Sequence, residues 1–465
     1  MILIRDAEVD GLRVDVRITG GRVTGIGRRL TRRGEEVIDA GGGALIPGLV
    51  DHHLHLHALA AAMRSAHCGP PDVSGAAGLA TTLAAAPADE HGWVRGVGYH
   101  ESVAGDLDAA GLDRLHCARP VRLQHRSGAL WIVNSPGMRR IGLAQADQHG
   151  IERAADGTPT GRLWRADAWL RSRLPRTGPP DLTAVGTRLS RFGITAVTDA
   201  TPDLAPAALD SLASAVTTGA LRQHVRVLGA PLGVAPPAPL TVGPYKIVLA
   251  DSGLPELDAL TEVIRRAHVA GRPVAVHCVT REALVLLLAA LDETGSVAGD
   301  RIEHAALAPP ELVDGLAGRG LRVVTQPGFL VHRGDDFLRA LPTGDRPDLY
   351  RCAGLVAAGI PLALSSDAPF GPLDPWAVIA AAVHRRTPAG VVAGRAERLS
   401  PAAALDAYLA APEAPGGPPR RVRPGAPADL ALVDRPLADV LTGLPLSASP
   451  VRTTFLAGRQ GPPRS

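Results

Sequence analysis

The feature that most constrains this fold is a succession of short apolar segments, each with the residue types of a buried β-strand. Most are followed by a stretch of helical periodicity, at residues 256–270, 281–293, 310–317, 348–358 and 375–386. This alternation is typical of parallel strands joined by helical crossovers. Eight strands are expected, at 45–55, 194–199, 225–228, 245–249, 273–279, 301–306, 321–326 and 361–367. The sequence therefore predicts an α/β protein whose main domain is a (β/α)8 TIM barrel.

The two ends of the chain have a different pattern. Short segments at 12–18, 22–26, 36–38, 428–433 and 451–457 alternate apolar and polar residues and are bounded by glycines or prolines, as small antiparallel strands are. Because chain termini often lie close together, residues 1–46 and 420–465 are predicted to form one composite β-sandwich domain. The barrel would take residues 47–419. Within it, residues 58–190 are too many for one crossover and are interpreted as a largely helical insertion over the barrel mouth.

The charge balance argues against several classes of function. The 49 Lys and Arg residues stand against 46 Asp and Glu, the formal net charge is +3, and aromatic residues are only 3%. Binding to nucleic acid is therefore not expected. No apolar run is long enough to span a membrane, the first residues lack a secretory signal pattern, and the four cysteines form no CxxC pair. These features predict a cytoplasmic protein that does not bind membranes.

Side chains that can bind metals stand at the ends of several expected strands. They are Asp51, His53 and His55 in the segment 47–55, and His277, His304 and Asp367 at later strand ends. The first three share one face because strand side chains alternate. Taken singly, each histidine could be a core residue bonded to a carbonyl, and Asp367 could cap a helix. Because the carboxyl ends of parallel strands meet at one mouth of a barrel, the set together predicts a metal site.

Lys246 is the single lysine of the chain and lies in the apolar segment 243–249. A buried amine that loses its proton can react with carbon dioxide to give a carbamate, an anionic ligand able to bridge two divalent cations. Arginine stays protonated and has no such chemistry. The alternative is that one lysine survived by chance in an ion-paired position.

With these motifs together, the sequence resembles the amidohydrolase superfamily, in particular amidohydrolase family 3, the branch similar to N-substituted formamide deformylases. The resemblance covers essentially the whole chain, from the first-strand motif at 47–55 to the return into the β-sandwich at 424–430. It implies a site for two divalent metal ions, zinc in the first place, bridged by carbamylated Lys246. The implied ligands are His53, His55, Lys246, His277, His304 and Asp367.

The resemblance and the positions of other residues suggest how a substrate would be bound. The segment 124–134 of the insertion is similar to a family stretch that contributes to the pocket, and it supplies His125 and Arg126. Arg281 follows the fifth strand, where this branch commonly has an acid, and Gln326 ends the seventh. Two guanidiniums facing one cleft would favour a substrate with an anionic group. Local ion pairs for the arginines, a loop role for His125 and core packing for Gln326 are the alternatives. The remaining histidines, His52 among them, are expected in solvated or loop positions.

The predicted function is hydrolysis of a carbon–nitrogen bond in a small-molecule amide, N-acyl compound or cyclic amide. A hydroxide bridging the two metals would attack, and Asp367 would be the catalytic residue that moves its proton to the leaving nitrogen. A mononuclear deaminase on the same barrel is the first alternative, although such enzymes resemble a pattern with Glu at the position of Thr280. A non-catalytic scaffold is the second. Formation of a homo-oligomer is left open.

Overall fold

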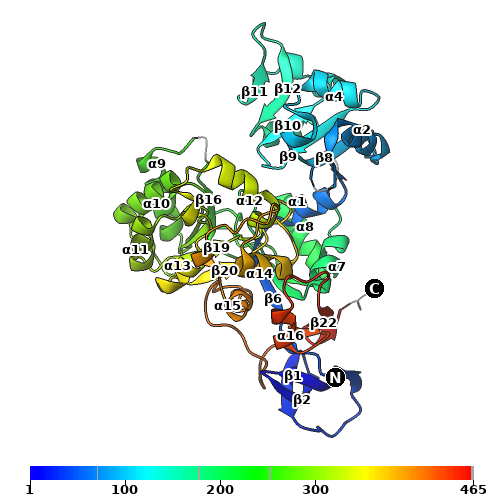
Figure 1. Ribbon diagram of the computed structural model, residues 1–465, viewed down its shortest axis with the longest axis vertical. Helices are drawn as coiled ribbons and strands as arrows, with labels where there is room; N and C mark the ends of the chain where they lie inside the picture. The colour runs from blue at the N-terminus through cyan, green and yellow to red at the C-terminus, as the bar shows by residue number, and fades with distance from the viewer. Residues whose placement is uncertain (71, 176–177, 251–252, 462–465) are drawn as a thin grey trace. The chain divides into compact units, whose positions relative to one another are not determined.

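The computed structural model describes residues 1–70, 72–175, 178–250 and 253–461 of the 465. The chain divides into two compact units (Figure 1), one made of Met1–Leu56 and Asp181–Ser465 and the other of His57–Pro180. No helix within the four described ranges has the length and apolar character needed to cross a bilayer.

Two parallel sheets form the centre of the larger unit. The first has the order β15-β14-β13-β6 and the second the order β16-β17-β18-β19-β20. Their strands are β6 (Leu49–Leu54), β13 (Ile194–Asp199), β14 (His224–Val227), β15 (Thr241–Val242), β16 (Tyr245–Val248), β17 (Val274–Cys278), β18 (Arg301–His304), β19 (Arg322–Thr325) and β20 (Leu362–Leu364). Each of the eight segments expected as a parallel strand overlaps one of them, and β15 is additional. All residues of β13 and β18 are buried, as expected of strands covered on both faces.

The first expected strand is in fact two strands. Residues Leu45–Pro47 form β5, which pairs antiparallel with β21 (Leu430–Val433), and β6 starts only after Gly48. A Cβ at Gly48 would lie 2.1 Å from the Thr195 side chain, so this position needs a residue without a side chain. The chain thus changes sheets at a glycine, where periodicity alone indicated one continuous strand.

Helices follow most of the parallel strands. They are α8 (Pro206–Thr217), α9 (Leu257–Val269), α10 (Arg281–Thr294), α11 (Pro310–Gly318), α13 (Cys352–Ala357) and α14 (Pro375–His384). The side chain of Thr280 accepts a hydrogen bond from the Ala283 N–H and so caps α10. Helices α8 and α12 (Phe329–Ala340) lie outside the five stretches in which helices were expected.

The two chain ends supply two further four-stranded sheets of the larger unit. One has the order β3-β2-β1-β4, from β1 (Ile2–Val9), β2 (Leu12–Thr19), β3 (Arg22–Gly27) and β4 (Glu36–Asp39). The other has the order β23-β22-β21-β5, with β22 (Val451–Leu456) and β23 (Arg459–Gln460). A hydrophobic cluster unites them, since Ile4 and Val16 of the first sheet belong to the same buried core as Leu430 and Phe455 of the second.

The unit 57–180 has a six-stranded sheet with the order β11-β12-β10-β9-β8-β7. Its strands are β7 (Ala66–His67), β8 (Val94–Tyr99), β9 (Val121–His125), β10 (Leu130–Val133), β11 (Ile151–Arg153) and β12 (Pro159–Trp164), and its helices include α2 (Gly75–Ala85) and α4 (Ala109–Leu115). The prediction of a largely helical insertion is therefore wrong. Leu123 and Ile132 belong to one core cluster and Trp131 and Val133 to another, so alternate residues of β9 and β10 face two apolar layers.

The boundaries of this unit also differ from the predicted insertion. Helix α7 (Thr183–Arg191) was placed in the insertion 58–190 but belongs to the larger unit.

Candidate metal centre

Three side chains from different strands of the larger unit converge at the carboxyl ends of the parallel sheets. His53 lies on β6, His304 ends β18, and Asp367 follows β20. One ligand atom from each lies within 4.8 Å of the others, and all three residues are buried. This spacing would allow all three side chains to bind a single metal ion.

Two further predicted ligands lie beside this group. His55 Nε2 is 3.2 Å from Asp367 Oδ1, and the His55 ring meets the edge of Phe370 at a centroid distance of 5.7 Å. The ring of His277, on β17, has its centroid 4.3 Å from that of His304. The structure therefore brings the four predicted histidines and Asp367 into one cluster.

A second layer of polar groups orients the imidazoles. His53 Nδ1 hydrogen bonds to Glu303 Oε2, His55 Nδ1 lies 3.1 Å from Thr201 Oγ1, and His304 Nδ1 lies 2.7 Å from Gln326 Oε1. Each contact uses one ring nitrogen and leaves Nε2 available, which is the usual arrangement around metal-binding histidines. For His53 and His55, Nε2 lies 3.5 and 3.2 Å from Asp367 Oδ1.

Glu303 is the important residue that the sequence reading missed. The signal was present, because an acid inside the fully buried strand β18 needs a buried partner. Strand alternation predicts Glu303 and His304 on opposite faces, so the sequence did not indicate that Glu303 lies beside the histidine cluster. In the structure His304 has a φ of +74°, outside regular strand geometry, so alternation does not hold at this residue.

Positive φ values mark the site elsewhere too. Asp367 has a φ of +53° and Ala305 a φ of +45°, in the left-handed region that non-glycine residues seldom occupy. Strained residues of this kind tend to occur at functional sites, where surrounding contacts hold them in place.

Lys246 lies on β16 and is only 5% exposed. Lys246 pairs with Ala275 of β17, and β17 pairs on its other side with β18, which carries His304. One strand therefore separates Lys246 from His304. Burial lowers the pKa of the Lys246 amine, partly opposed by the negative charges of Glu303 and Asp367. An amine in this setting is more readily neutral, and hence nucleophilic, than one on the surface.

Asp51 and His52 are both fully buried on β6. The Oδ1 atom of Asp51 accepts hydrogen bonds from the N–H groups of His53 and Ser366, both at 3.2 Å, and burial raises the pKa of Asp51 to about 7. His52 is fully buried, and burial lowers its pKa to about 3. The expectation that His52 is solvated is therefore wrong, because every residue of β6 is covered.

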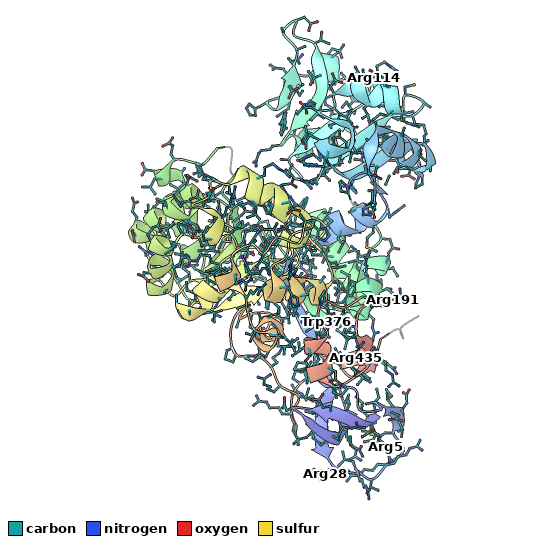
Figure 2. All side chains as sticks on the ribbon, in the orientation of Figure 1. Arg5, Arg28, Arg114, Arg191, Trp376 and Arg435 are labelled. Atoms are coloured by element: carbon teal, nitrogen blue, oxygen red, sulfur yellow. The ribbon has the colours of Figure 1, made fainter. Side chains whose placement is uncertain are left out.

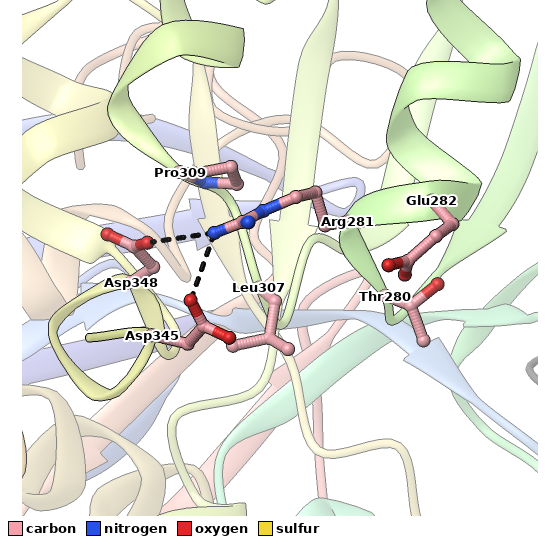
Figure 3. A pocket seen from close by; sticks show the side chains of 7 residues that line it. All are labelled: Thr280, Arg281, Glu282, Leu307, Pro309, Asp345 and Asp348. Atoms are coloured by element: carbon pink, nitrogen blue, oxygen red, sulfur yellow. Dashed lines mark hydrogen bonds and ion pairs between the residues drawn. The ribbon is translucent and has the colours of Figure 1, made fainter. Parts of the chain in front are cut away.

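Two predicted substrate contacts of the larger unit have other partners. Gln326 is fully buried, and besides His304 its amide reaches Ser365 Oγ at 2.9 Å, so it holds the His304 ring in place. Arg281 Nη2 lies 3.0 Å from Asp345 Oδ1 and 3.9 Å from Asp348 Oδ2. These three residues line a pocket of about 120 Å³ together with Thr280, Glu282, Leu307 and Pro309 (Figure 3).

His125 and Arg126 belong to the unit 57–180. His125 Nε2 lies 3.3 Å from the Glu101 carboxylate, its Nδ1 lies 2.8 Å from Ser127 Oγ, and its ring stacks on His100 at 6.1 Å. The N–H of Arg126 donates to the Tyr99 carbonyl at 2.9 Å. Their contact with a substrate stays a prediction.

The side chains of this cluster are suited to binding a divalent metal ion. Asp367 Oδ1 is buried and accepts no hydrogen bond from any residue the structure describes, although imidazole nitrogens surround it. A buried carboxylate oxygen of this kind is costly unless a cation or a donor occupies the space beside it. Imidazole and carboxylate are ligands that zinc and related divalent ions prefer.

Comparisons with known proteins agree with this geometry. Residues 36–460 match the family described as the amidohydrolase family, and the chain belongs to that family. It is a hydrolase. Its sequence is 24% identical to N-substituted formamide deformylase of Arthrobacter pascens, over 92% of this chain and 91% of that one.

Two solved structures show the same fold. An uncharacterized metal-dependent hydrolase of Pyrococcus horikoshii has a TM-score of 0.74 at 19% identity, over 94% of this chain and 96% of its own. Atrazine chlorohydrolase TrzN of Arthrobacter aurescens, complexed with zinc, has a TM-score of 0.57 at 14% identity, over 99% of this chain and 95% of its own.

Proposed function

We propose that this protein hydrolyses a carbon–nitrogen bond of a small-molecule amide, N-acyl compound or cyclic amide with the help of two divalent metal ions, zinc in the first place. The observation that carries the proposal is the convergence of ligand atoms from His53, His304 and Asp367 within 4.8 Å. Family membership and the low identity to a formamide deformylase support this reaction class.

In the proposed site, His53, His55 and Asp367 would hold one ion, and His277 and His304 would hold the other. Lys246, as its carbamate, would be an anionic ligand to both. Burial of Lys246 supports this assignment because it favours the neutral amine that reacts with carbon dioxide. The ring centroid of His304 lies 4.9 Å from that of His53 and 4.3 Å from that of His277. These short distances support a shared metal centre.

Divalent ions bound there would supply Lewis acidity, which makes a water nucleophilic near neutral pH and polarises a carbonyl. Asp367 is the catalytic residue in this proposal. Its buried carboxylate would take the proton of the attacking water and deliver it to the leaving nitrogen. Glu303 and Gln326 hold the His53 and His304 rings while this proton moves.

We also propose that the two parallel sheets close into one (β/α)8 barrel, with the chain-end sheets as a β-sandwich. Two hydrogen bonds between the sheets support closure. The Lys246 N–H donates to the Leu228 carbonyl at 3.3 Å, and the Asp367 N–H donates to the His53 carbonyl at 2.8 Å.

Metal content and turnover test the proposal together. Protein purified without chelator should contain close to two divalent ions per chain, and His304→Ala should lose metal whereas His67→Ala, at an exposed histidine of the other unit, should not. Metal-loaded protein should release amine from N-substituted formamides or N-acyl amino acids, or open the ring of cyclic amides to amino acids. A plateau at one ion with release of ammonia from amino-substituted heterocycles would favour a mononuclear deaminase. Absence of both bound metal and turnover would favour a non-catalytic scaffold.

A further inference from the structure

The sheet of the unit 57–180 brings two arginines together on one face. Strands β8 and β9 are parallel, and their register pairs Arg95 with Arg122. Paired residues of adjacent strands project to the same face, so the two guanidinium groups are neighbours. Trp131 of β10 is on this face too, because it pairs with Gln124, two residues beyond Arg122. The guanidinium carbons of Arg95 and Arg122 lie 5.4 and 5.9 Å from the centroid of the Trp131 ring.

Neither positive charge is neutralised locally. Arg95 donates to Ser65 Oγ at 2.6 Å and to Gln124 Oε1 at 3.5 Å, and both acceptors are neutral. The Nε atom of Arg122 is buried and has no hydrogen-bond acceptor among the residues the structure describes. Within the same described ranges, neither arginine forms an ion pair with a carboxylate.

The acids in the neighbourhood are engaged with other donors. Asp167 accepts a hydrogen bond from Trp131 Nε1 at 2.8 Å. Asp89 accepts hydrogen bonds from the backbone N–H groups of His91 and Trp93, each at 2.9 Å. Both acids therefore act on the arginines only at longer range.

Two like charges partly withdrawn from water destabilise one another. Burial lowers the pKa of Arg95 to about 10, with repulsion from Arg122 as a further cause, and burial also lowers the pKa of Arg122. Both residues are only partly buried, so part of each side chain is in contact with solvent. An anion between the two groups would remove the repulsion and supply acceptors to the unused donors.

We propose that Arg95 and Arg122, supported by Trp131, form a binding site for the oxyanion group of a small molecule, a carboxylate or a phosphate. The guanidinium fork matches either group in a bidentate manner, and stacking on the indole limits the movement of both side chains. None of these residues is among the proposed metal ligands, and the proposal does not depend on the hydrolytic reaction.

The test uses thermal unfolding of the full-length protein at constant ionic strength, with inorganic phosphate in one arm and acetate in the other. The melting temperature of the wild type should rise saturably with at least one anion, and the responsive arm identifies the group. Arg122→Gln should weaken the apparent affinity about tenfold or more, because one of two charged donors is lost. Arg114→Gln, at an exposed arginine of α4, is the matched control and should respond like the wild type (Figure 2).

Comparing variants separates this site from anion binding at a metal centre, which Arg122→Gln would leave unchanged. Arg122→Lys keeps the charge but not the fork, should have an intermediate affinity, and serves if the Gln variant does not fold. An absent or non-saturable response of the wild type to both anions would overturn the proposal. So would equal responses of the wild type and the position-122 variants.

Discussion

His53 and Glu303 form a buried hydrogen bond although 250 residues separate them in the sequence. The imidazole is 1% exposed and the carboxylate is fully buried. The other oxygen of Glu303 accepts a hydrogen bond from Arg301 Nε at 2.6 Å, so the acid is balanced by a neighbouring cation. This chain of contacts fixes the His53 ring with Nε2 directed toward Asp367.

We expect Glu303→Gln to weaken metal binding about 10- to 100-fold, the usual effect of removing an acid that orients a metal ligand. The measurement is a competition titration of the metal-free protein with a chromophoric chelator. Glu293→Gln, at an exposed acid of α10, is the control and should bind metal as the wild type does. Unchanged affinity in the position-303 variant would show that Glu303 serves only to balance Arg301.

Lys246→Arg should abolish turnover as completely as Lys246→Ala, because a guanidinium retains the positive charge and has no route to an anionic bridge. Activity of the Ala variant should return in part with acetate or propionate, which can occupy the vacated space beside the metals. Steady-state kinetics with and without the added acid measure this. Near wild-type turnover of Lys246→Arg would rule out the carbamate.

Asp367→Asn should lower kcat on the order of 10²-fold or more, with a smaller change in KM, because a proton shuttle acts in the transition state. Metal content must be measured on the same sample, since Asp367 is also a proposed ligand. If the variant retains both metals and an unchanged kcat, the proton moves through another group.

Arg281 and its aspartate partners give opposite expectations for an anionic substrate. Arg281→Ala should cost about 1 to 3 kcal/mol in kcat/KM for an N-acyl amino acid and spare its methyl ester, if the guanidinium binds the carboxylate. Asp345→Asn removes the acid that now lies 3.0 Å from Arg281 and should improve kcat/KM for the free acid only (Figure 3). Equal effects on acid and ester in both variants would assign the ion pair to the loop structure.

The pH dependence of stability should include a contribution from His224. Its Nε2 lies 3.0 Å from Asp429 Oδ2, and this hydrogen bond raises the pKa of His224 above its ordinary value. A raised pKa stabilises the fold fully below the unfolded value, about 6.5, and the contribution disappears as the pH rises through the folded value.

The side chain of His224 is 62% exposed, so the contribution should be below about 1 kcal/mol. Urea unfolding should therefore show a larger difference between the wild type and His224→Gln at about pH 5.5 than at about pH 9. His149→Gln, at another exposed histidine, should show no such trend. A difference that is independent of pH would contradict the assignment.

The sequence predicted what depends on local pattern. Alternation of apolar segments with amphipathic stretches indicated all eight parallel strands, and the positions of His53, His277, His304 and Asp367 at strand ends indicated where chemistry would gather. These inferences succeed because a buried strand requires apolar residues throughout, and an imidazole or carboxylate placed there needs a partner.

Local pattern gave less information about the residues 57–180. Short, half-buried strands and short helices have similar composition, and only pairing between distant segments decides which of them forms. The strands β9 and β10 are stabilised by each other and by two apolar layers, none of which is visible within either segment.

Tertiary structure alone decided the partners of the candidate ligands. The sequence by itself determined that His53, Glu303 and Gln326 are present at strand ends, but not that Glu303 would hold His53 or that Gln326 would hold His304. It likewise left Arg281 free to face a substrate, whereas the fold gives it Asp345 and Asp348. The reason is physical: periodicity fixes which face a side chain takes, whereas a hydrogen bond depends on where another segment, 22 to 250 residues away in these pairs, places its own side chain.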